Sequence, residues 1–335
     1  MDTENINVLD STATPQNLRA LAKRAVLSSN DLEQALARIG HLPDASRWTR
    51  FLDWVLLVLG AGFFISGVFF FFAFNWQELH RFAKLGVVEL AVLLAVGVAF
   101  WQSLDRLPGK IALTVAGLLV GALFAVYGQI YQTGADSYQL FLTWALLIAG
   151  WVLISKFAPL WFIWIVLLNL SVIFYYLQII GTINGLLYLA LFLLNGGVLL
   201  CWEVFKRLGV SWLQSRWTPR LLSLLIFAAL VAPTLALIFV SEYATTRDPW
   251  LPVMAILFVV TSVLTLYLYS QKILDQFILI VCAFSVIITL IAGLLKAGNV
   301  ETGTLLLAGA LVIGLAALVV TWLSHLSKDW EARKI

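Results

Sequence analysis

From Phe51 onward the chain is an almost unbroken series of apolar segments, most of them about twenty residues long and separated by short polar stretches. An α-helix needs about 20 apolar residues to cross the hydrocarbon core of a bilayer. Only 12% of the residues are charged and the mean hydropathy is +0.97, whereas soluble domains carry about 25% charged residues. These features exclude a soluble globular domain, a disordered chain and a disulfide scaffold. They predict an all-α, polytopic integral membrane helical bundle.

Ten segments are predicted to span the membrane, and the break between the fourth and the fifth depends on Lys156 and Pro159. They are 51–74, 85–104, 111–131, 140–155, 160–180, 186–205, 220–242, 251–270, 276–296 and 304–324. We divide the chain into a cytosolic helical hairpin (1–50), two five-span regions (51–180 and 181–324) and a cytosolic tail (325–335).

The basic residues predict the orientation of these spans. With the N-terminus in the cytoplasm, 17 Lys and Arg residues lie on the cytoplasmic side and 4 lie on the outer side. Cytoplasmic loops of membrane proteins are enriched in Lys and Arg. Because ten is an even number, both termini are predicted to be cytoplasmic.

The polar N-terminal region is predicted to form two short amphipathic helices near 15–27 and 30–39. Thr14 and Pro15 have the N-cap and N1 signature of the first helix, and Ser29 or Asn30 is expected to cap the second. Such a hairpin is too small to bury a core alone. It is either a cytosolic lead-in or a module, over residues 15–39, for a protein partner or self-association.

Polar side chains gather in two patches at the predicted outer ends of the first three spans. An aromatic-walled cleft formed by these patches would suit a small polar ligand or a lipid headgroup. The candidate ligand-binding residues are Asn75, Trp76, Glu78, Glu89, Tyr127, Gln129, Tyr131 and Asp136. If the two patches converge, they form one outward-facing pocket. Otherwise each patch simply ends its own helix.

Several of these residues also have purely structural interpretations. Glu89 is either a proton carrier in the bundle or a carboxylate that reaches the outer interface. Asp136 is either a ligand-binding group or a helix cap. Inside the spans, Asn169 and Asn195 are predicted to hydrogen-bond across helices, and the Gly117–Gly121 pair to pack closely against a neighbouring helix.

The sequence of the two polar patches also resembles that of a known protein family. The stretches FAFNW (72–76), KL (84–85) and GQIYQ (128–132), together with Asp136 and the N-terminal hairpin, resemble predicted bacterial membrane proteins grouped as DUF2157. The resemblance covers residues 15–180. It implies a multi-pass protein of the bacterial inner membrane, and it supplies no catalytic or ligand-binding residues.

Three classes of function fit the sequence: a transporter or permease for a small molecule or lipid, a non-catalytic envelope sensor or scaffold, and a membrane-embedded enzyme at the outer face. The GxSxG, HExxH, Walker A and GxGxxG motifs are absent, so the enzyme class is the least favoured. The sequence predicts no cofactor and no metal site, and no nucleic-acid partner. The expected surroundings are the lipid bilayer.

The orientation can be tested with single cysteines at Ser137 and Ser215 in a chain that lacks Cys201 and Cys282. A membrane-impermeant thiol reagent should modify Ser137→Cys and spare Ser215→Cys in intact cells, because only position 137 is predicted to lie outside. The reverse labelling pattern would show that the predicted orientation is wrong.

Overall fold

A computed structural model describes residues 14–23, 26–38, 48–49, 76, 78–132, 134–239, 248–298 and 301–332, together with scattered positions between 51 and 74. The described residues form helices and turns and contain no strand, which confirms the all-α prediction. The chain divides into two compact units, residues 1–80 and 81–335, and each is described by itself.

The first unit contains the predicted hairpin of α1 (Pro15–Lys23) and α2 (Ser29–Arg38). The Thr14 hydroxyl accepts a hydrogen bond from the Asn17 N–H at 3.3 Å, so Thr14 caps α1 as predicted. The predicted cap of α2 is wrong by one residue. Ser28 accepts from the Asp31 N–H at 3.2 Å and donates to the Asp31 carboxylate at 2.7 Å, which leaves Ser29 as the first helical residue.

The second unit supplies the spans. Among the described residues, nine helices are long and apolar enough to cross a membrane. They are α4 (Arg81–Trp101), α5 (Leu107–Tyr131), α6 (Ser137–Ser155), α7 (Ala158–Tyr175), α8 (Gly185–Arg207), α9 (Trp217–Phe239), α11 (Trp250–Gln271), α12 (Gln276–Ala297) and α13 (Thr302–Ala332). A π-helical turn, η1 (Tyr176–Ile180), extends α7, and a 3₁₀ turn, η2 (Ser211–Leu213), precedes α9.

These nine helices match nine of the ten predicted segments. The remaining segment, 51–74, is described only at scattered positions, so it and the division into two five-span regions stay predictions. Helix α13 continues to Ala332, into the segment 325–335 that the sequence predicts to be a cytosolic tail, and the location of that tail stays a prediction. Trp330 accounts for this extension. Its side chain is buried against α11 and α12, and its indole N–H donates to the Ser270 carbonyl at 3.0 Å.

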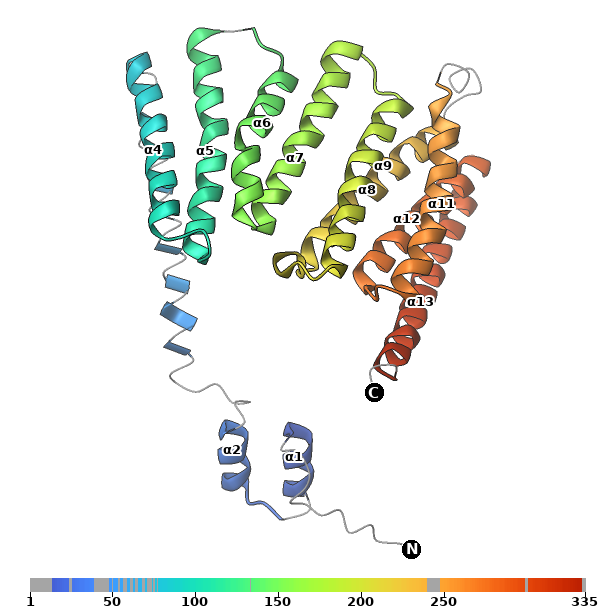
Figure 1. Cartoon of the computed structure of the whole chain (residues 1–335). Helices are drawn as coiled ribbons and strands as arrows, with labels where there is room; N and C mark the ends of the chain where they lie inside the picture. The colour runs from blue at the N-terminus through green and yellow to red at the C-terminus, as the bar shows by residue number, and fades with distance from the viewer. Residues whose placement is uncertain are drawn as a thin grey trace, which may run out of the picture. The chain divides into compact units, whose positions relative to one another are not determined.

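Within the second unit, consecutive helices alternate in direction and α4 to α8 stand side by side (Figure 1). The connections after α4, α6, α8 and α11 therefore share one end of the unit. This end carries most of the basic residues of the unit, and we call it the basic end. They are Arg106, Lys110, Lys156, Lys206, Arg207, Arg216, Arg220 and Lys272. The other end is the one that the sequence predicts to be outer.

Helices α4 to α7 share one apolar core, in which the Gly117–Gly121 pair lets α6 approach α5. The Trp144 ring lies where a side chain on Gly121 would be, and the Trp144 indole N–H donates to the Gly117 carbonyl at 2.7 Å. Any larger residue at position 121 would displace that ring. The close packing predicted from the glycine spacing is confirmed.

Helices α8, α9, α11 and α12 form a second core, and α11 to α13 form a third. Asn169 on α7 and Asn195 on α8 join the first core to the second. Their side-chain amides exchange hydrogen bonds of 3.1 and 2.7 Å, and each also donates to a carbonyl one turn earlier in its own helix. Both are buried. This confirms the predicted cross-helix bonding.

Replacing either asparagine should weaken the joint between α7 and α8. Asn195→Ala is expected to lower the free energy of unfolding by about 0.6 kcal/mol, the average for hydrogen bonds between membrane helices, and by at most about 1.7 kcal/mol. The Asn169→Ala/Asn195→Ala double variant should cost less than the sum of the single variants, because the first change already removes the shared bonds. Unfolding in mixed detergent micelles measures this, with Cys201→Ser on the exposed side of α8 as control. Strict additivity would contradict the coupling.

Candidate functional site

A polar cavity of about 640 Å³ lies between α5 and α6 at the end of the second unit opposite the basic end. Its walls combine aromatic rings with uncharged hydrogen-bonding side chains. The lining residues are Phe124, Tyr127, Gly128, Gln132, Gly134, Ala135, Ser137, Gln139, Leu140 and Thr143. The volume falls within the range of about 300–1,000 Å³ that is usual for small-molecule sites.

The turn between α5 and α6 shapes the cavity. Gln132 ends α5 in the left-handed conformation (φ 44°), and its N–H donates to the Gly128 carbonyl. Gly134 also has a positive φ of 62°, which costs glycine little. The turn is held by Gln178 of η1, which accepts from the Tyr138 N–H at 3.1 Å and donates to the Ser137 hydroxyl at 3.2 Å. Residues of α5, α6 and η1 therefore hold this wall of the cavity in place.

Four predicted site residues lie in or beside α5 and the turn. Tyr127 lines the cavity, and the Tyr131 ring packs against the Tyr127 ring with centroids 4.6 Å apart, as their spacing predicts. Gln129 and Asp136 do not line the cavity. Asp136 occupies the N-cap position of α6, but its carboxylate accepts no capping hydrogen bond.

Three of the other four predicted site residues are not tested against this cavity. Glu89 is exposed on α4 within the second unit and does not line the cavity. Trp76 and Glu78 belong to the first unit, and Asn75 lies outside the described residues. The convergence of the two patches stays a prediction. Among the described residues, no cluster of three or more His, Cys, Asp or Glu side chains could hold a metal ion.

An ion cluster with two buried carboxylates lies at the basic end and was not predicted from the sequence. Arg216 lies 3.2 Å from the Glu203 carboxylate and 3.9 Å from the Asp275 carboxylate, and it donates to the Ile273 carbonyl at 2.9 Å. Arg220, one turn along α9, donates from Nε to both Asp275 oxygens at 3.2 Å. Two cations thus neutralise two anions. Such pairing is what allows carboxylates to be buried.

The cluster ties α8, the start of α9 and the loop between α11 and α12 together. Only 1% of the Asp275 side chain is exposed, and its Oδ1 also accepts from the Phe277 N–H, so that it caps α12. Two sequence signals point to the cluster: the four-residue spacing of Arg216 and Arg220, and an aspartate directly before an apolar run.

This arrangement defines a polytopic helical membrane protein with a polar cavity at one end and an ion cluster at the other. Residues 19–161 match the family described as "Predicted membrane protein (DUF2157)". This match confirms, for these residues, the resemblance that the sequence motifs carry. No curated protein and no solved structure matches the chain.

Asp275→Asn should destabilise the protein, because it removes the charge that pairs with Arg216 and Arg220 while keeping a side chain able to cap α12. Removing one partner of a buried pair costs about 3–5 kcal/mol, and the partial exposure of both guanidinium groups reduces the cost here. Asp275→Ala should cost about 1 kcal/mol more, since it also removes the cap. Thermal unfolding in detergent measures both.

Asp105→Asn, an exposed carboxylate at the same end, is the control and should leave the unfolding temperature unchanged. If Asp275→Asn were as stable as this control, the ion cluster would contribute nothing to the fold.

Proposed function

We propose that the chain is a permease-like protein that carries a small polar molecule or the headgroup of a lipid, with the cavity between α5 and α6 as its outward-facing binding site. The observation that carries this proposal is the uncharged polar lining of that cavity. Ser137, Gln139 and Thr143 offer donors and acceptors, and Tyr127 offers an aromatic face. This combination suits a neutral, hydroxyl-rich ligand, because such ligands need many hydrogen bonds and no counter-ion.

The orientation is part of the proposal. We propose a bacterial inner membrane location with both termini in the cytoplasm, supported by the gathering of basic residues at one end of the second unit. The cavity then opens to the outer side. We also propose that Tyr131 contributes to ligand binding, because its ring packs against the Tyr127 ring, whereas Glu89, Gln129 and Asp136 do not line this cavity.

The lining chemistry favours binding over catalysis. A hydrolytic site at the outer face would need a carboxylate or another group able to transfer protons. The described lining residues include no acidic side chain, and Asp136 stands outside them. A scaffold role through the α1–α2 hairpin remains the second candidate, since its two helices are strongly amphipathic.

A permease differs from a static pocket because its binding site opens to each side in turn, and this can be tested without knowing the ligand. We expect Thr143→Cys, in a chain without Cys201 and Cys282, to react with a charged, impermeant methanethiosulfonate reagent in right-side-out vesicles and also in inside-out vesicles. Thr143 lies in the second turn of α6, below the cavity rim.

Two matched variants calibrate the reaction. Ser137→Cys at the rim should react only in right-side-out vesicles, and Ser215→Cys only in inside-out vesicles. Modification of Thr143→Cys from the outer side alone would show a static pocket, and the permease proposal would fail.

A further inference from the structure

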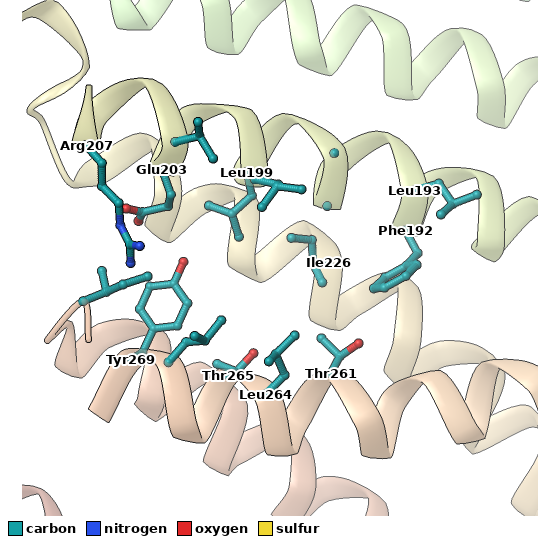
Figure 2. A pocket seen from close by; sticks show the side chains of 16 residues that line it. Phe192, Leu193, Leu199, Glu203, Arg207, Ile226, Thr261, Leu264, Thr265 and Tyr269 are labelled. Carbon is teal, nitrogen blue, oxygen red and sulfur yellow. The ribbon is translucent and has the colours of Figure 1, made fainter. Parts of the chain in front are cut away.

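A second cavity, of about 540 Å³, forms a groove between α8 and α11 (Figure 2). Phe192, Leu193 and Leu199 line it from α8, Leu264 and Thr265 line it from α11, and Ile226 of α9 lies between them. At the basic end, the groove is lined instead by the polar side chains of Glu203, Arg207 and Tyr269. The Tyr269 hydroxyl points toward α8. The groove is therefore amphipathic along its length.

Two adjacent glycines keep the groove open in its middle. A Cβ atom built on Gly196 or Gly197 would meet no other atom within 4 Å, so the space beside them is empty. The groove extends along α8 from Phe192 to Arg207, which at a rise of about 1.5 Å per residue is about 22 Å. Half of a hydrocarbon core of about 30 Å is about 15 Å. The groove thus has the length of one leaflet plus its headgroup region.

The net positive charge at the basic end of the groove favours the binding of an anion. Glu203 is already paired with Arg216, and Asp275 with Arg220. Arg207 lines the groove, is exposed, and forms no ion pair with any residue that the structure describes. Together these five side chains carry three positive and two negative charges, and Lys206, whose charge interacts with Glu203 and Asp275, adds a fourth positive charge. An anionic group at the mouth of the groove would balance the Arg207 cation, and a guanidinium binds phosphate well.

We propose that this groove binds one anionic phospholipid from the leaflet at the basic end. One acyl chain lies between α8 and α11 beside Gly196, and the phosphate accepts hydrogen bonds from Arg207. Basic sites between membrane helices bind anionic headgroups in this way, and each Lys or Arg near the surface favours an anionic lipid by about fivefold in affinity. The site is separate from the cavity between α5 and α6, so this proposal does not depend on the permease proposal.

Native mass spectrometry of the full chain, released from detergent with either dioleoylphosphatidylglycerol or dioleoylphosphatidylcholine, tests the proposal. We expect one tightly bound phosphatidylglycerol per chain, and several-fold lower occupancy by phosphatidylcholine. Arg207→Gln should lower phosphatidylglycerol occupancy to the phosphatidylcholine level, and Arg207→Lys should retain most of the preference. Arg106→Gln, which removes an exposed cation at the same end outside the groove, is the matched control and should bind as the parent does.

Gly196→Leu should reduce the occupancy of both lipids, because its side chain fills the path of the acyl chain. A phosphatidylglycerol with a photoreactive diazirine in the middle of its acyl chain then locates the site. Because this experiment uses the parent protein, its result does not depend on whether the variants fold. Cross-links should map to peptides of α8 and α11 around Leu193, Leu199 and Leu264. Equal binding of the two lipids by the parent, or cross-links that avoid α8 and α11, would overturn the proposal.

Discussion

The absence of water in the hydrocarbon core is the constraint on which the rest of this structure depends. Each backbone N–H and C=O must find a partner inside the protein, and an α-helix satisfies nearly all of them within one segment. Polar side chains inside the spans obey the same rule. Ser171, Thr234 and Ser262 donate to carbonyls one turn earlier in their own helices, and Asn169 and Asn195 bond to each other across two helices.

For the same reason, the charged side chains of the described spans lie near the helix ends, except for the exposed Glu89 of α4. At one end of the bundle, ion pairs join four charged side chains: Glu203, Arg216, Arg220 and Asp275. This cluster ties together the end of α8 and the starts of α9 and α12. It also pairs the carboxylates of Glu203 and Asp275, so neither of them neutralises Arg207 at the mouth of the groove.

The two cavities differ because their positions along the helices differ. The cavity between α5 and α6 lies at helix ends, where a turn with two left-handed residues opens space and amides and hydroxyls can face water. The groove between α8 and α11 extends past the middle of the span, where glycines open space and mostly apolar side chains surround it. A polar ligand suits the first cavity, and a lipid chain suits the second.

The sequence alone determined the elements whose cause is local. Hydropathy over twenty residues fixed nine of the described spans, the Thr14–Pro15 signature fixed the start of α1, and the spacing of Tyr127 and Tyr131 placed their rings together. One local prediction was wrong, the cap of α2, because Ser28, Ser29 and Asn30 are all good caps and small differences in backbone position choose among them.

Only the tertiary structure decided the contacts between distant segments. The pairing of Arg216 with Glu203, the bond from Trp330 to the Ser270 carbonyl and the groove beside Gly196 all join helices whose order in space is not written in the hydropathy pattern. An apolar helix faces lipid and protein with similar side chains. Its sequence therefore predicts that it spans the membrane, whereas the packing of its neighbours determines which face lines a cavity.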